Sequence, residues 1–200
     1  MPDQIGTMEE NALITLMAER RSFPRLGDPG PNEQELVAIL QAALRAPDHR
    51  RLRPWRFLII QNADRSALGD LFAEHTIASN PHASAELLLK EKNKAFRAPL
   101  ILVGIASVVE HPKVPRIEQM LSAGCVLGNV GLAAYAIGLG AVWRTGVYAY
   151  SDLVREGLGL SENEEINGFL YIGTPVSRDR PLSKISLDDH VKRWPQNIRG

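Results

Sequence analysis

The hydrophobic positions of this chain follow two periods, one typical of helices and one typical of buried strands. Capping signatures, a polar residue followed three positions later by Glu, predict helices that begin at Thr7 and at Asn32. The first should end near Arg20 and the second before Pro47, because a residue that precedes proline avoids the helical region. Further patterns predict helices at about 64–75, 83–95 and 115–137, two short helices capped by Ser151 and Ser161, and buried strands at 56–60, 100–106, 141–147 and 169–173.

Strands that alternate with helices predict an α/β or α+β domain built around a central sheet. The length of 200 residues suits one domain, so we expect a single domain over 1–200. Residues from about 177 to 200 are polar and show little periodicity. They are either a loose tail or an arm laid across a partner subunit.

Composition excludes several classes of protein. Hydrophobic residues make up 44% and charged residues 23%, which is ordinary for a globular protein and unlike a disordered one. Lys and Arg number 23, as do Asp and Glu, so the net charge is zero, which argues against a dedicated nucleic-acid binder. The chain has one cysteine, Cys125, and no signal-peptide pattern at its start, so we expect a reducing compartment, the cytoplasm.

The stretch from Gln119 to Trp143 carries no charged residue and is long enough to span a bilayer. It also contains polar side chains and several glycines, and Gly138 and Gly140 indicate a helix end before a strand. We therefore expect a buried helix, in a core or an oligomer interface, rather than a membrane span. Cys125 on this helix is expected to be a buried, inert thiol.

Known catalytic signatures are missing from the sequence, which has no phosphate-binding glycine loop, no nucleophile elbow and no Cys/His metal spacing. Basic groups instead gather at element ends. Arg20, Arg21 and Ser22 either cap the first helix or clamp an anion. The arginines of 45–56, beside Trp55, form either a solvated loop or a surface for single-stranded nucleic acid. A buried strand does not tolerate an unpaired Arg144, so this residue should face an anion, a cleft or the rim.

These sites occur within an ordered set of motifs that resembles the nitroreductase family of FMN-dependent NAD(P)H oxidoreductases, in particular its small YdjA-like branch. The resemblance covers about residues 8–176. It rests on Arg20–Ser22, Arg45–His49 with Pro54 and Trp55, Arg97–Leu100, His111–Arg116, the glycine-bearing central helix, Trp143–Gly146 and Gly168–Pro175.

The resemblance implies an α+β fold with a central mixed sheet flanked by helices. It also implies a homodimer whose long central helices pack across the interface, with FMN between the subunits. Carried over by position, the cofactor-binding residues would be Arg20, Arg21, Ser22, Arg45, His49, Trp143, Arg144, Thr145 and Gly146. Arg20, Arg21 and Ser22 would hold the phosphate and ribityl chain, whereas Trp143, Arg144 and Thr145 would line the flavin ring. The segment 133–138 is associated with the nicotinamide nucleotide in the YdjA-like branch.

The resemblance implies an enzyme that passes a hydride from NADH or NADPH through flavin N5 to a small electron-poor acceptor, a nitroaromatic or a quinone, in two successive steps. The flavin carries the chemistry, so no catalytic side chain and no metal are expected. Two alternatives stay open: a flavin-binding protein of the same fold that breaks down, stores or senses flavin, and a nucleic-acid-binding module that uses the arginines of 45–56. The chain departs from the family pattern at Asp48, Arg51 and Arg53, so the resemblance does not identify the acceptor.

Overall fold

The structure is a computed structural model that describes residues 11–177 and 181–194. Its centre is a five-stranded sheet with the order β1-β5-β3-β2, and β4 also pairs with β5. The strands are β1 (Leu26–Gly27), β2 (Trp55–Gln61), β3 (Leu100–Ser107), β4 (Gly140–Arg144) and β5 (Glu164–Pro175). The expected α+β class is confirmed. Every strand pair within the described residues is antiparallel. The parallel pair that a mixed sheet would also contain does not occur among them.

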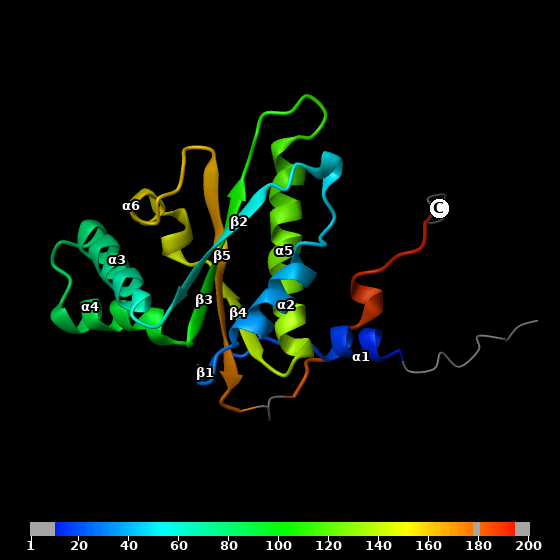
Figure 1. The fold of residues 1–200 in the computed structure, drawn as a ribbon, viewed down its shortest axis with the longest axis horizontal. Coiled ribbons are helices and arrows are strands. Elements are labelled where there is room, and N and C mark those ends of the chain that lie inside the picture. Colours follow the sequence, from blue (N-terminus) through cyan, green and yellow to red (C-terminus); the bar gives the residue numbers. More distant parts are fainter. Residues whose placement is uncertain (1–10, 178–180, 195–200) are drawn as a thin grey trace, which may run out of the picture.

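Helices cover both faces of the sheet (Figure 1). One face packs against α2 (Glu33–Ala43) and α5 (Arg116–Ala136) through Ile39, Leu127 and Leu170. The other face packs against α3 (Asp64–Ser79) and α6 (Asp152–Gly157), with α4 (Ala85–Lys92) beside α3; Phe72 and Phe169 lie in this second core. β3 is buried along almost its whole length, as a strand with helices on both sides must be.

Two of the predicted caps, Asn32 and Ser151, mark where helices begin. Asn32 and Glu35 form a reciprocal capping box at α2, and Ser151 accepts a hydrogen bond from the Val154 amide at α6. α1 (Ala12–Glu19) begins after Asn11, whose side chain caps it. The predicted start at Thr7 lies outside the described residues.

Several predicted elements differ from the structure, and the last strand begins at Glu164 rather than at 169. The second short helix, expected after Ser161, is absent from the described chain, because the segment turns directly into β5 and Glu164 takes part in the sheet. The third buried strand ends at Arg144 rather than Val147, since Gly146 adopts a left-handed conformation (φ 59°) and leads into a 3₁₀ turn at Val147–Tyr150.

α5 is long and apolar enough to cross a membrane by length and composition alone, and one third of its most apolar window is buried in this chain. Its inner residues pack on the sheet, but Ile117 and Leu121 remain about 60% exposed. Gly128 has no described atom within 4 Å of where a Cβ would stand. Cys125 is also exposed, so the expectation of a buried thiol is wrong. One face of α5 is therefore open in the single chain.

The described part of the C-terminal segment, residues 181–194, is exposed throughout and has a single 3₁₀ turn at Leu187–Asp189. Its large apolar side chains include Ile185, Leu187 and Trp194, each at least 74% exposed. The segment is therefore not part of this chain's core.

Candidate cofactor site

The Arg20–Ser22 segment lies next to β4, although the two are more than a hundred residues apart in sequence. Arg20 ends α1, and the amide of the following Phe23 donates a 3.1 Å hydrogen bond to the Ala141 carbonyl of β4. Arg20 and Ser22 are exposed, whereas Arg21 is half-buried and its Nε donates to the Glu19 carbonyl (3.4 Å). Two guanidiniums and a hydroxyl on one edge suit an anion better than helix capping alone.

Trp143 is fixed between β5 and α5. Its Nε1 donates a 3.1 Å hydrogen bond to the Asn167 carbonyl. The indole covers Gly168, where a Cβ would overlap Trp143 Nε1 and where φ is +153°, so only glycine fits without strain. The far end of the ring reaches towards Gly124 of α5, at 3.8 Å from where a Cβ would stand. The ring is 42% exposed, which leaves an aromatic surface available to a ligand.

Thr145 and Gly146 follow directly, where the chain leaves the sheet, and both are exposed. The arrangement therefore brings Arg20, Ser22, Trp143 and Thr145 to one side of the molecule, along and just beyond the outer edge of β4.

The end of this loop is held from the other side by a buried polar cluster. Tyr148 stacks on Phe72 with ring centroids 3.9 Å apart, and its hydroxyl donates to Glu91, which also pairs with Lys94. Burial, followed by the hydrogen bond to Glu91, raises the pKa of Tyr148. Burial acts to raise the pKa of Glu91, but its hydrogen bonds with Lys94 and Tyr148 outweigh this and lower it. The pair therefore stays as a neutral phenol and a carboxylate, and anchors the chain that follows Gly146.

Arg45 and His49 lie on the opposite flank of α5. Arg45 is exposed after the end of α2. His49 Nδ1 lies 2.6 Å from Glu118 Oε2, and Ser122 donates a 2.8 Å hydrogen bond to the Pro47 carbonyl. Both contacts hold this loop against the N-terminal half of α5.

The loop between α2 and β2 is ordered by one carboxylate. Asp48 accepts hydrogen bonds from the amides of Leu52 (3.1 Å) and Arg53 (2.8 Å). Arg50, Arg51 and Arg53 adopt left-handed conformations, with φ of 64°, 57° and 49°. Asp48, one of the departures from the family pattern, is therefore a structural residue of this loop.

In one chain, the two groups of predicted residues do not meet. Glu118 and Ser122 are four positions apart and share one flank of α5, whereas Gly124, beside Trp143, is six positions from Glu118 and about 240° around the helix. The exposed face with Ile117 and Leu121 lies between the two flanks. The structure thus brings Arg20–Ser22 together with Trp143 and Thr145, and leaves Arg45 and His49 elsewhere.

Arg144 points to the other face of the sheet from Trp143. Successive strand residues alternate between faces, and Val142 packs with the core under α3 whereas Ala141 packs with the core under α5. Arg144 lines a pocket of about 500 Å³ with Arg25 and Arg97. The sequence motifs included Arg97 without giving it a role, and nothing singled out Arg25.

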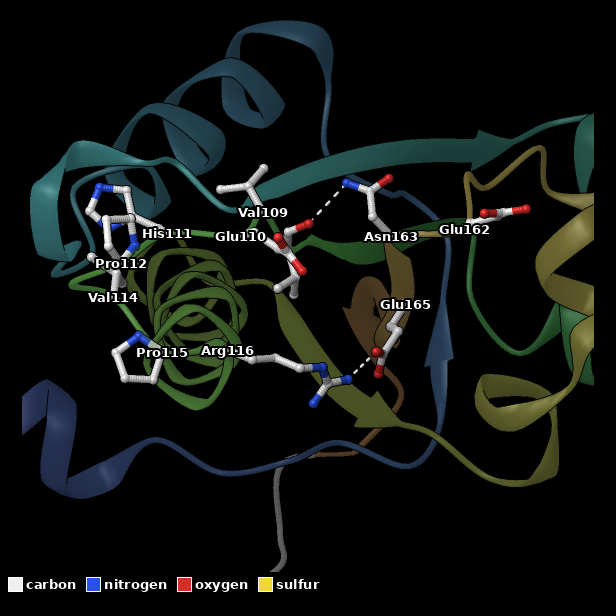
Figure 2. A pocket seen from close by; sticks show the side chains of 11 residues that line it. Val109, Glu110, His111, Pro112, Val114, Pro115, Arg116, Glu162, Asn163 and Glu165 are labelled. Atoms are coloured by element: carbon white, nitrogen blue, oxygen red, sulfur yellow. Dashed lines mark hydrogen bonds and ion pairs between the residues drawn. The ribbon is translucent and has the colours of Figure 1, made fainter.

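A cavity of about 820 Å³ lies at the end of the sheet where β3 ends and β5 begins, and none of the predicted cofactor-binding residues line it (Figure 2). It is lined by the loop before α5 and the start of β5, where Arg116 pairs with Glu165 and Asn163 donates a 3.0 Å hydrogen bond to the Val108 carbonyl. No group of three or more His, Cys, Asp or Glu side chains suited to a metal occurs within residues 11–177 and 181–194.

Comparison with known proteins identifies the family. The Nitroreductase family model matches residues 17–174. The chain belongs to the nitroreductase family. It is 41% identical over 162 residues to YdjA of Escherichia coli (strain K12), which is named as an NAD(P)H nitroreductase; the match covers 81% of this chain and 87% of that protein.

Solved nitroreductases share the fold. A nitroreductase-like protein from Bacillus cereus superposes with a TM-score of 0.77 at 23% identity, covering 98% of this chain and 100% of that one. A nitroreductase from Desulfovibrio desulfuricans, solved in complex with FMN, gives a TM-score of 0.73 at 22% identity, covering 94% of this chain and 99% of that one. The predicted family, its YdjA-like branch and the fold are confirmed.

Proposed function

We propose that this nitroreductase family member is an NAD(P)H-dependent flavin oxidoreductase that binds FMN between two copies of the chain. The separation of the predicted residues onto two flanks of α5 carries the proposal. A second chain packed on the open face of α5 would bring its own Arg45 and His49 towards the first chain's Arg20–Ser22 and Trp143. The family, the name of YdjA and the FMN-bound relative support the choice of cofactor.

The residues present fit FMN. Arg20, Arg21 and Ser22 offer charge-assisted and hydroxyl hydrogen bonds to a phosphate. Trp143 offers an aromatic surface whose orientation the Asn167 carbonyl fixes. Thr145 and Gly146 offer exposed backbone beyond the edge of β4. Arg45 and His49 of the partner subunit would complete the site.

FMN, when bound, supplies the redox chemistry by taking up a hydride from NADH or NADPH and reducing an acceptor. The protein's part is then to bind and orient the reactants. The site contains no pair of carboxylates and no Cys/His arrangement, so no side chain is assigned as an acid, base or nucleophile. We infer that donor and acceptor use the same exposed surface beside Trp143 in turn. We further infer that the acceptor is a small, electron-poor molecule of the nitroaromatic or quinone type.

The homodimer is supported by apolar surface that one chain leaves uncovered. Leu13, Ile14 and Met17 of α1 are each more than half exposed, as are Ile117 and Leu121 of α5. An apolar groove of about 420 Å³ runs between α1, α2 and α5. Contiguous apolar patches of this kind are typical of subunit interfaces. The exposed apolar side chains of 181–194 fit an arm that lies on the partner.

We propose neither a membrane nor a nucleic acid as a partner of this protein. A second copy accounts for the apolar face of α5, and a net charge of zero gives no general attraction to phosphate backbones. We therefore keep the cytoplasm as the proposed location.

An absorption spectrum of the purified protein, recorded before and after addition of NADPH and NADH without oxygen, tests the proposal. A flavin spectrum that bleaches with either nucleotide is the expected result. Flavin that stays oxidised with both would favour a flavin-binding protein with another role. A colourless protein that also fails to take up added FMN would contradict the proposed cofactor.

A further inference from the structure

A pocket on the face of the sheet opposite α5 carries three arginines and no carboxylate. Its volume is about 500 Å³, and its lining residues are Pro24, Arg25, Leu26, Phe96, Arg97 and Arg144. The arginines come from three separate segments: Arg25 precedes β1, Arg97 precedes β3 and Arg144 ends β4. The topology of the sheet thus gathers three charges of one sign at one cavity.

Their charges are not neutralised within the described chain. Arginine stays protonated at any physiological pH, and none of the ion pairs among residues 11–177 and 181–194 involves these three. Arg25 and Arg97 are exposed and can be hydrated, but Arg144 is half-buried. Its Nε is shielded from solvent and has no hydrogen-bond partner among the described residues. A buried donor without a partner is costly, so a ligand acceptor here would be favourable.

Tyr171, a phenol beside two of the arginines, does not supply the missing negative charge. Tyr171 of β5 lies close enough to Arg97 and Arg144 for both to act on its hydroxyl. Burial raises its pKa to about 12, although the two arginines act in the opposite direction. The phenol therefore stays neutral near pH 7.

We propose that Arg25, Arg97 and Arg144 form a second anion site, distinct from the Arg20–Ser22 cluster, which binds an anionic oxygen group carried by a substrate. The group is a phosphate or a carboxylate, because guanidiniums bind both with paired hydrogen bonds. The inference rests on the proposed function, since it assigns the pocket to one of the two reactants. The sources are the 2′-phosphate of NADPH and a carboxylate on the acceptor.

The position of the pocket separates it from the flavin surface. Trp143 projects towards α5, whereas Arg144 projects towards the core that contains Tyr171. Both residues belong to one strand and are adjacent, so a ligand beside Trp143 could place a charged substituent around the edge of β4 into the pocket. Arg144 would then position the charged end of the substrate rather than line the flavin ring.

The first test measures binding of inorganic phosphate to the FMN-loaded protein by calorimetry, with chloride at the same ionic strength as the reference. In that form the FMN phosphate would occupy the Arg20–Ser22 cluster, in line with the proposed function. The double variant Arg25→Gln/Arg97→Gln should bind phosphate at least tenfold more weakly than the wild type, whereas Arg155→Gln, a change on α6 outside the pocket, should not. Equal phosphate binding by all three proteins overturns the proposal.

The second test identifies the source of the anion through two matched pairs of substrates. NADPH is compared with NADH, and 4-nitrobenzoate with 4-nitrobenzyl alcohol. The double variant should raise KM at least tenfold for the member of one pair that carries the extra anionic group, the 2′-phosphate or the carboxylate. kcat should change little, and KM for the other member of that pair should stay within twofold of the wild-type value. An effect on NADPH alone assigns the pocket to the 2′-phosphate, and an effect on nitrobenzoate alone assigns it to the acceptor. Equal effects on both members of both pairs overturn the proposal.

The two proposals can fail separately. If the double variant loses FMN while Arg155→Gln retains it, the pocket belongs to the cofactor and the second site is wrong, but the flavoprotein is not. If the wild type never binds FMN, the proposed function is wrong. The phosphate titration of the unloaded protein, compared with that of the double variant, then still decides whether the three arginines hold an anion.

Discussion

At the scale of single residues, Glu164 shows how one buried charge can be satisfied completely. Its carboxylate accepts hydrogen bonds from Arg56 Nε (2.6 Å) and Nη2 (2.7 Å), from the Ser107 hydroxyl (2.8 Å) and from the Ser161 amide (3.0 Å). The paired guanidinium, with the two further donors, outweighs burial and lowers the pKa of Glu164 from 4.5 to about 2. The ion pair joins β2 to the start of β5 across β3.

The Glu164→Gln variant should therefore be less stable in a pH-dependent way. At pH 7 the lost charge-assisted bonds should lower the free energy of unfolding by about 2 kcal/mol. Because the folded pKa lies below the unfolded one, the carboxylate's contribution is complete above about pH 4.5 and is lost as the pH falls towards 2. Urea unfolding at pH 7, 5 and 3.5 should show the gap between wild type and variant narrowing.

The neighbouring Glu165 gives the control for that experiment. It pairs with Arg116 on the surface, and both side chains are about half exposed. Glu165→Gln should change the free energy of unfolding by less than about 1 kcal/mol at every pH. A gap for Glu164→Gln that stays constant down to pH 3.5 would contradict the assigned pKa.

Gly168 provides the second prediction at this scale. A Cβ at this position would overlap the Trp143 indole, and its φ of +153° strains any other residue. Gly168→Ala should therefore lower the free energy of unfolding by about 2 kcal/mol and displace the indole. Gly27→Ala is the control, since its nearest neighbour would lie at 3.7 Å. Tryptophan emission and FMN affinity should change in the first variant only, and an unaltered FMN affinity in Gly168→Ala would argue against Trp143 as a flavin contact.

At the scale of elements, local chemistry predicted where helices begin but not which segments stay helical. The Asn32 and Glu35 signature marks a true helix, whereas the same spacing at Ser161 and Glu164 does not. Glu164 still accepts a hydrogen bond from the Ser161 amide, but Arg56, 108 positions away, also binds its carboxylate and keeps Glu164 in the sheet. A tertiary ion pair overrides a local cap, and no window of local sequence contains both partners.

The prediction at the scale of elements concerns the exposed face of α5. Leu121 is 63% exposed at the centre of the open face, where the proposed partner packs. Leu121→Lys should convert the dimer into monomers, because it places a charge in an apolar interface, and should lower FMN content at the same time. Light scattering after gel filtration, together with the ratio of flavin to protein absorbance, measures both effects.

Leu89→Lys is the matched control for this experiment, because Leu89 is also well exposed, at 58%, but lies on α4. It should leave both the mass and the flavin content unchanged. A Leu121→Lys protein that remains a dimer with full flavin would remove α5 from the proposed interface.

At the scale of the whole molecule, the sequence predicted the family and most of the elements, but not the arrangement of the site within one chain. The order of motifs points to one cofactor, yet Arg45 and His49 lie on one flank of α5 and Trp143 on the other. The sequence also could not predict to which face of the sheet Arg144 points. That direction depends on the residue at which β4 begins, because successive residues of a strand point to opposite faces. The pocket with Arg25 and Arg97 follows from that register and from the close approach of three chain segments.

The shared site makes a prediction that only an assembly of two chains can satisfy. One variant, Arg20→Ala/Ser22→Ala, removes the groups beside β4, and another, Arg45→Ala/His49→Ala, removes the groups on the other flank of α5. Each should form a dimer with little bound FMN. In a mixed dimer, one of the two sites would contain both defects and the other neither.

Co-expression of the two variants should therefore restore flavin to about a quarter of the wild-type content, because about half of randomly paired dimers are mixed and each has one intact site. Each variant expressed alone is the control and should stay nearly colourless. If each chain built its site alone, every site in the mixture would carry one defect and no flavin would return. The ratio of flavin to protein absorbance in the co-purified dimers distinguishes these outcomes without reference to activity. The experiment tests directly whether Arg45 of one chain and Trp143 of a second chain belong to the same FMN site.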